Sequence, residues 1–104
     1  SIHTLYNEYD AHEWCHTIPN AMIVTAALLY CDGDLGKAIC LAVEAAFDTD
    51  CNGATIGSII GLCRGKSGID PYWYETFHSR LFTTIIGYTD VTVKELAEKT
   101  YAQL

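Results

Sequence analysis

The sequence predicts an all-α fold, on three observations. Apolar residues recur at helical spacing through most of the 104 residues. Asp, Thr and Pro stand where several of these apolar segments begin, which is typical of helix N-termini. Half of the residues are apolar, which is enough for a hydrophobic core, and the length suits one domain or a piece of one.

The first half of the chain predicts three helices. The first covers residues 2–16. A second follows Pro19, which suits the first turn of a helix, and covers 20–30. Because this second helix is apolar nearly all round, we expect it to be central and buried. The third covers 35–46 and is capped by Asp34.

The chain is less regular after residue 50. A helix is expected over 53–62, followed by a glycine-rich connection over 65–71. Residues 72–82 are aromatic and fit more than one structure. Residues 81–86 have the composition of a strand, but the sequence offers no evident strand partner.

The last segment, 91–104, predicts an amphipathic helix. Apolar and polar positions alternate at helical spacing along it, with charged residues on the outer face. Thr92 and Glu95 have the spacing of a capping box, which marks the start of the helix.

Composition and charge exclude several classes of protein. The formal net charge of −7 argues against nucleic-acid binding, which needs a basic patch. Apolar stretches such as 21–29 are too short to span a bilayer, so no membrane partner is expected. Five scattered cysteines, an odd number without a Cys-x-x-Cys pair, predict free thiols in a reducing compartment, and hence a cytoplasmic protein. Three of them have apolar surroundings and are expected in the core: Cys15, Cys40 and Cys63.

Two carboxylates stand two residues apart between two apolar helical segments. Asp48 and Asp50 repel each other at this spacing, and a hard divalent cation would relieve the repulsion by accepting oxygen from both. The following helix would direct its N-terminus, which favours anions, at the same place. The alternative is helix capping, with Asp50 or Asn52 as the cap and Asp48 in the loop. Spacing alone leaves both interpretations open.

Glycines recur every four residues after this pair and so share one helix face: Gly53, Gly57, Gly61 and Gly65. Each costs roughly 1 kcal/mol relative to Ala inside a helix, so a compensating contact is expected. Close approach of another helix is the favoured explanation, and room beside a bound ligand is the other.

The segment 12–16 matches the zinc-metalloprotease pattern His-Glu-x-x-His. On a helix, His12 and His16 would share a face, with Glu13 as general base and Glu44 as a third ligand. Pro19 interrupts the helix within a turn of His16, and the motif has a high false-positive risk. A chance match is therefore favoured over a zinc metalloprotease.

Residues 48–61, Asp-Thr-Asp-Cys-Asn-Gly-Ala-Thr-Ile-Gly-Ser-Ile-Ile-Gly, resemble the C-terminal signature of the ADP-ribosylglycohydrolases. The segment 14–21, the pair Gly33-Asp34 and the segment 96–100 resemble bacterial members of the same family. The resemblance covers nearly the whole chain in the correct order.

The resemblance implies an all-α fold and a binuclear Mg²⁺ or Mn²⁺ centre. Such a centre hydrolyses the N- or O-glycosidic bond that joins ADP-ribose to a modified protein or small molecule. The metal ligands that it implies are Asp48, Asp50 and Cys51. Cys51 stands where the family usually has Thr, and a thiol is a soft ligand that suits Mg²⁺ poorly. Either its side chain does not bind the metal, or the metal preference is altered.

The resemblance also implies that the chain is incomplete. Family members are considerably longer, and a Thr/Ser-Asp-Asp motif near their N-terminus supplies the opposite half of the metal site. Residues 1–104 contain no such triplet and are expected to be the C-terminal third, with the N-terminal part absent and the isolated chain inactive. Uncovered apolar helix faces predict a homo-oligomer. The alternative function is a non-catalytic helical association module.

Overall fold

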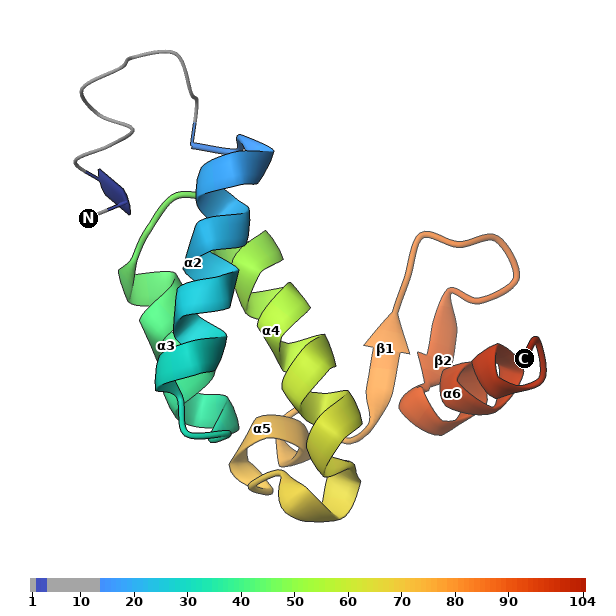
Figure 1. The fold of residues 1–104 in the computed structure, drawn as a ribbon. Helices are drawn as coiled ribbons and strands as arrows, with labels where there is room; N and C mark the ends of the chain where they lie inside the picture. The colour runs from blue at the N-terminus through green and yellow to red at the C-terminus, as the bar shows by residue number, and fades with distance from the viewer. Residues whose placement is uncertain (1, 4–13) are drawn as a thin grey trace. The chain divides into compact units, whose positions relative to one another are not determined.

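The computed structural model describes residues 2–3 and 14–104, and the chain divides into two compact units, Ser1–Ile69 and Asp70–Leu104. Helices are the main elements, so the predicted all-α class is confirmed (Figure 1). The first unit contains α2 (Thr17–Tyr30), α3 (Leu35–Glu44), α4 (Thr49–Arg64) and the 3₁₀ helix η1 (Lys66–Gly68). The second contains α5 (Tyr72–Glu75), β1 (Arg80–Phe82), β2 (Asp90–Thr92) and α6 (Val93–Tyr101).

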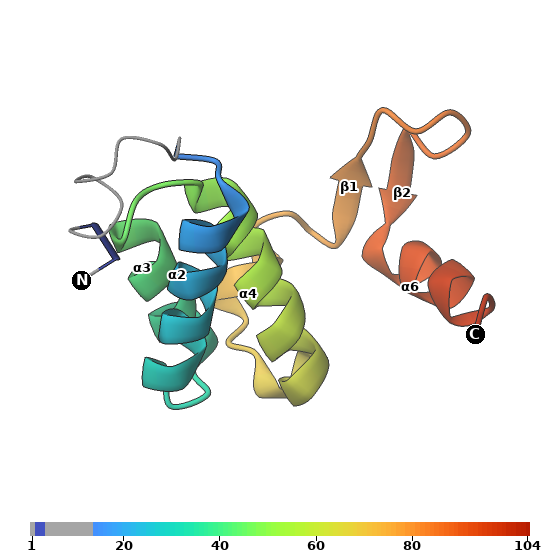
Figure 2. The ribbon, with the colours of Figure 1, turned by 45° about the horizontal axis from the view of Figure 1, so that its top comes forward.

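The first unit is a bundle of α2, α3 and α4, in which α3 runs opposite to the other two (Figures 1 and 2). Its buried core comes from all three helices and the residue after α2: Ile23, Ala27, Cys31, Ala38, Ala42, Ile56 and Ile60. Small side chains let helix axes approach closely. The alanines of α2 and α3 therefore give the large isoleucines of α4 room to be buried between the helices.

The helix expected over 2–16 does not reach residue 16. Residues 14–15 form a turn, and α2 begins at Thr17, three residues before the expected start. His16 is its N-cap, with Nδ1 accepting a hydrogen bond from the Ile18 N–H at 3.3 Å. Residues 4–13, which were expected to be helical, lie outside the described residues.

The prediction that the second helix is central and buried is wrong for its outer face. Only one face of α2 packs against α3 and α4, and Leu29 and Tyr30 on the outer side are 75% and 71% exposed. In the part of the chain that the structure describes, α3 and α4 are the helices that pack on α2, and two neighbouring helices cannot cover a whole helix circumference. No helix in the described ranges combines the length and the apolar character needed to cross a membrane.

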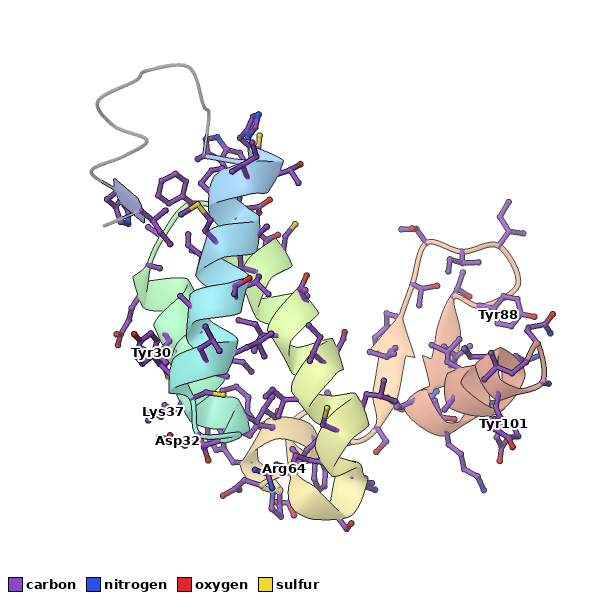
Figure 3. All side chains as sticks on the ribbon, viewed as in Figure 1. Tyr30, Asp32, Lys37, Arg64, Tyr88 and Tyr101 are labelled. Carbon is purple, nitrogen blue, oxygen red and sulfur yellow. The ribbon has the colours of Figure 1, made fainter. Side chains whose placement is uncertain are left out.

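The turn between α2 and α3 closes one end of the bundle. Gly33 has φ of 75°, in the left-handed region that favours glycine. Asp34 caps α3 as predicted, accepting from the Lys37 N–H at 2.6 Å. Arg64, at the end of α4, donates from Nε to the Gly33 carbonyl at 3.1 Å, and Asp32 forms an ion pair with Lys37 (Figure 3).

The second unit pairs β1 with β2 in an antiparallel hairpin, with Leu81 opposite Val91. The strand-like segment therefore has a partner strand. This partner, Asp90–Thr92, overlaps the start of the helix that was expected over 91–104. Because Asp90–Thr92 are used for pairing, α6 begins only at Val93. The predicted capping box is confirmed: the Glu95 N–H donates to Thr92 Oγ1 at 3.1 Å, and the Thr92 N–H donates to Glu95 Oε2 at 2.8 Å.

The cysteines are free, but their predicted burial is wrong in three cases. Cys15, Cys40 and Cys63 are exposed, and the buried thiol is Cys31. Cys31 follows the last turn of α2, and its Sγ donates to the Leu28 carbonyl at 3.3 Å. Apolar neighbours in sequence did not indicate which side of each helix faces the core.

Replacing Ile56 by Ala tests the bundle core. Ile56 is fully buried, so Ile56→Ala removes packed atoms and should lower the free energy of unfolding by about 2–5 kcal/mol. Ile59→Ala is the matched control on the same helix. Its side chain is 38% exposed, so the loss should be about 1 kcal/mol or less. Chemical denaturation followed by circular dichroism measures both. Equal losses would show that α4 does not bury the Ile56 face.

Candidate metal centre

The connection from α3 to α4 is short and conformationally unusual. The third helix ends at Glu44 rather than at residue 46, and α4 begins at Thr49 rather than at 53. Between them, Ala46 and Phe47 have φ of 62° and 61°, both in the left-handed region. Such a conformation costs non-glycine residues about 1–3 kcal/mol each, so the surroundings must hold it in place.

This connection places the predicted acidic pair at the start of α4. Asp48 occupies the N-cap position, and Asp50 lies in the first turn rather than on a loop before the helix. The loop placement expected for Asp50 is therefore wrong, because the helix begins four residues early. This position stabilises the charged form of the Asp50 carboxylate, because negative charge is favoured at a helix N-terminus.

The structure brings together the three side chains that the resemblance implied as ligands. One ligand atom from each of Asp48, Asp50 and Cys51 lies within 4.8 Å of the others, a group called here the Asp48–Cys51 cluster. Asp48 is half-buried, and the other two are exposed. The start of α4, which carries the cluster, lies at the end of the bundle opposite the turn between α2 and α3 (Figures 1 and 2).

Helix capping does not occupy these carboxylates. Asp48 is at the N-cap, but its side chain makes no capping hydrogen bond. Asp50 and Asn52 lie within α4, so neither is the cap that the alternative interpretation required. Among the described residues, no Lys, Arg or His forms an ion pair with either carboxylate.

The carboxylates act on the neighbouring thiol. A hydrogen bond with Asp48 is the main cause that raises the pKa of Cys51, and the negative charges of Asp48 and Asp50 act in the same direction. Both effects disfavour the thiolate. Cys51 therefore keeps its proton in the absence of a cation, which is the opposite of an activated nucleophile.

Two buried asparagines lie directly beneath the cluster. Asn20 on α2 and Asn52 on α4 are 9% and 3% exposed. Asn52 Nδ2 donates to Asn20 Oδ1 at 2.7 Å, and the Asp48 N–H donates to the same oxygen at 3.2 Å. These bonds join α2 to the start of α4.

His3 also contacts the connection between α3 and α4. His3 Nε2 donates to the Ala45 carbonyl at 2.6 Å, and its ring lies 4.8 Å from the ring of Phe47. No sequence pattern indicates a role for His3 or for Asn20. Asn20 could have been noticed as an amide in an otherwise apolar segment, whereas nothing in the sequence relates His3 to a segment 42 residues away.

The glycines of α4 do not mark a close helix contact in the described residues. A Cβ added at Gly57 would meet nothing within 4 Å. At Gly53 and Gly61 it would make ordinary contacts of 3.9 Å and 3.8 Å. The favoured explanation for the glycine spacing is therefore wrong here, because the alanines of α2 and α3 provide the close approach.

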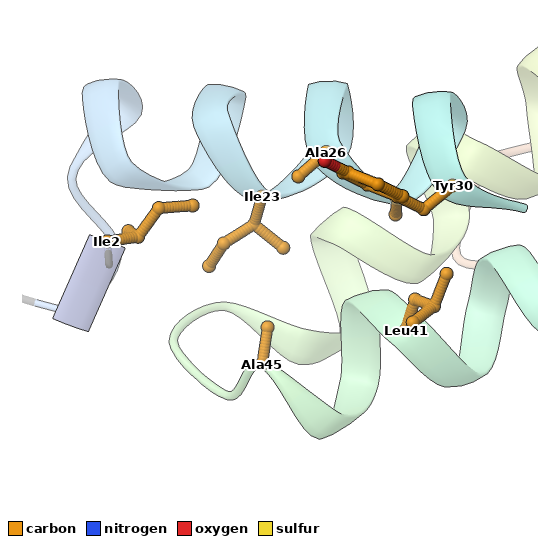
Figure 4. Close-up of a pocket in the computed structure, with 7 residues that line it drawn as sticks. Ile2, Ile23, Ala26, Tyr30, Leu41 and Ala45 are labelled. Atoms are coloured by element: carbon orange, nitrogen blue, oxygen red, sulfur yellow. The ribbon is translucent and has the colours of Figure 1, made fainter.

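A small cavity between α2 and α3 is a second concave feature (Figure 4). Its volume is about 150 Å³, and its lining is apolar apart from one phenol: Ile2, Ile23, Ala26, Ala27, Tyr30, Leu41 and Ala45. Since the lining contains no carboxylate, histidine or cysteine, this cavity has no set of metal ligands.

The described part of the zinc-protease pattern, residues 14–16, is not helical. Trp14 and Cys15 form a turn and His16 is a cap, so helical spacing does not continue up to His16. His12 and Glu13 lie outside the described residues. Glu44 is exposed at the end of α3, where it belongs to no described cluster of three metal-binding side chains.

Comparison with known proteins gives one family. A family model described as ADP-ribosylglycohydrolase matches residues 2–103. The matched range includes the Asp48–Cys51 cluster and all but the first residue of one compact unit and the last residue of the other. Neither a curated protein nor a solved structure matches the chain.

The raised pKa of Cys51 predicts slow alkylation that depends on Asp48. Asp48→Ala removes both the hydrogen-bond acceptor and the charge of Asp48 that raise this pKa, so more thiolate forms at a given pH and Cys51 should react faster with iodoacetamide. The midpoint of the rate against pH should move to lower pH in the variant. Peptide mass spectrometry measures the rate at each cysteine. Cys40, exposed on α3, is the internal control and should react at an unchanged rate. An unchanged Cys51 profile would contradict the Asp48 contact.

Proposed function

The chain belongs to the ADP-ribosylglycohydrolase family, and we propose that it supplies half of a binuclear metal centre which hydrolyses ADP-ribosyl bonds. The substrate class is ADP-ribose joined through an N- or O-glycosidic bond to a protein or a small molecule. Family membership supports the reaction class, and the Asp48–Cys51 cluster supports the metal site.

The observation that carries the proposal is the position of two carboxylates that, within residues 2–3 and 14–104, take part in no capping bond and no ion pair. Asp48 and Asp50 lie together at the N-terminus of α4. One ligand atom from each of them and from Cys51 lies within 4.8 Å of the other two. Carboxylate oxygens are the ligands that Mg²⁺ and Mn²⁺ prefer. The donor chemistry of these two residues therefore fits the cation that the family implies.

Cys51 fits less well and is the third candidate ligand. Its thiol is protonated beside two carboxylates, and a protein thiol must lose its proton to bind a metal. A cation held by Asp48 and Asp50 would neutralise the charge that keeps this proton in place. We propose that Cys51 shifts the site towards softer ions than Mg²⁺, with Mn²⁺ the nearest choice in the family.

In the proposed mechanism, the residues of this chain bind and orient. Asp48 and Asp50 would hold the cation, which when bound polarises the scissile bond and positions the ribose. Asp48 is half-buried and fixed through its main chain, so one ligand is held firmly. Asp50 and Cys51 are exposed, so a substrate could reach them.

A further segment is needed to complete the site. Mg²⁺ demands near-octahedral coordination and keeps its waters unless several ligands converge. Two carboxylates therefore hold it weakly. We propose that an N-terminal segment carrying the opposing ligands is the principal partner, and that these 104 residues alone are inactive.

Asp48→Asn and Asp50→Asn test the chemistry. Each should abolish metal-dependent release of ADP-ribose when the chain is combined with its N-terminal portion. The loss should exceed the roughly 10–100-fold that is typical when an outer-shell partner of a metal ligand is removed. The assay is hydrolysis of an ADP-ribosylated peptide with Mg²⁺ or Mn²⁺, and with EDTA.

Asp32→Asn is the matched control for these variants. Asp32 is an exposed carboxylate in the turn at the opposite end of the bundle, paired with Lys37 (Figure 3). Its loss should leave activity unchanged, and so should His12→Ala. Full activity of Asp48→Asn, or dependence on zinc and His12, would refute the proposed site.

Association is a second candidate function, favoured by the outer face of α2. An open groove of about 600 Å³ runs along this helix, and its lining is mainly apolar: Ile2, Thr17, Ile18, Ala21, Met22, Thr25, Ala26, Leu29 and Tyr30. Large exposed apolar surfaces are typical of interaction sites. We propose that the isolated chain forms a homo-oligomer through this face.

Sedimentation velocity at increasing concentration tests the association. The unmodified chain should sediment faster than a monomer, and Leu29→Lys should restore the monomer because it places a charge in the groove. Leu62→Lys is the control, since Leu62 is 87% exposed on α4 and does not line the groove. A monomer at all concentrations would reject the proposal, and equal effects of the two variants would reject the α2 face.

A further inference from the structure

We propose that Asn20 is a positioning residue that fixes the Asp48 main chain, and through it the Asp48 carboxylate, for cation binding. The inference rests on the proposed metal site. It adds a residue of α2, 28 positions away in sequence, that contributes no ligand itself.

Asn20 uses both ends of its amide. Its Oδ1 accepts from the Asp48 N–H at 3.2 Å and from Asn52 Nδ2 at 2.7 Å. Its Nδ2 donates to the carbonyls of Trp14 and His16, both at 2.9 Å. Because carbonyls only accept and the Asp48 N–H only donates, the orientation of the amide is determined by its partners.

The bonds form a closed set around Asp48. Asn20 Oδ1 accepts from the N–H of Asp48, the Asp48 carbonyl accepts from the Asn52 N–H at 2.9 Å, and the Asn52 side chain returns to Asn20. Asp48 is thus held on both sides of its Cα. This matters because Asp48 has φ −90° and ψ 77°, outside helical geometry, and follows two left-handed residues.

Stability alone gives a weak reason for this arrangement. Burying two amides costs desolvation, and apolar side chains of the same shape can be neutral or stabilising in their place. The network instead fixes a single position for a residue that makes no capping bond of its own. Groups hydrogen-bonded to metal ligands orient them, and their loss lowers metal affinity.

The experiment compares Asn20→Leu with Asn52→Leu in the 104-residue chain. Both variants break the buried amide pair, but only Asn20→Leu frees the Asp48 N–H. Amide hydrogen exchange by NMR reports the Asp48 N–H directly. Titration with Mn²⁺ into the millimolar range reports affinity at the Asp48–Cys51 cluster through paramagnetic broadening.

We expect the Asp48 amide to be protected in the unmodified chain and in Asn52→Leu, and to exchange rapidly in Asn20→Leu. Mn²⁺ affinity should fall about tenfold in Asn20→Leu and much less in Asn52→Leu. Circular dichroism checks folding. If Asn20→Leu does not fold, Asn20→Ser replaces it, because its shorter hydroxyl leaves the Asp48 N–H unreached without adding apolar bulk.

Two outcomes would overturn the inference and are distinguishable. The first is equal Mn²⁺ affinity in the Asn20 and Asn52 variants, or an unprotected Asp48 amide in the unmodified chain. Either result would show that Asn20 has only a structural role, and it would leave the proposed metal site unaffected. Absence of Mn²⁺ broadening at the cluster in the unmodified chain, with a protected Asp48 amide, would instead reject the metal site and the positioning role with it.

Discussion

The tight connection between α3 and α4 is the constraint on which the rest of the first unit depends. Ala38 and Ala42 of α3 lie against the isoleucines of α4, so the chain must reverse within the few residues that separate the helices. Ala46 and Phe47 adopt left-handed backbone to achieve this. Their strain, about 1–3 kcal/mol each, is borne by the surrounding contacts.

Those contacts come from elements on both sides of the connection. His3 binds the Ala45 carbonyl and lies against Phe47, and Asn20 receives the Asp48 N–H. A hydrogen bond contributes about 1 kcal/mol net, and leaving the partly buried Asp48 N–H unpaired would cost more. The same contacts that make the reversal possible therefore also fix where Asp48 begins the next helix.

The charge arrangement follows from this geometry. Because α4 starts at Thr49, Asp50 and Cys51 lie in its first turn beside Asp48, and all three offer ligand atoms within 4.8 Å. The helix N-terminus partly compensates two like charges. The pKa of Cys51 is raised first by its hydrogen bond with Asp48 and then by the charges of Asp48 and Asp50. This arrangement is the basis of the proposed cation site.

Local chemistry by itself determined much of this protein. The all-α class, the Asp34 cap, the Thr92–Glu95 capping box and the family follow from residues close together in sequence, because caps and periodicity act within a turn or two. Tertiary structure decided the rest. The start of α4, the pairing of β1 with β2, the exposed side of α2 and the role of Asn20 depend on contacts across many residues, and no local pattern encodes them. The acidic residues and their proximity were evident from the sequence, whereas the helix start on which they lie is held in place by contacts with α2 that no local pattern encodes.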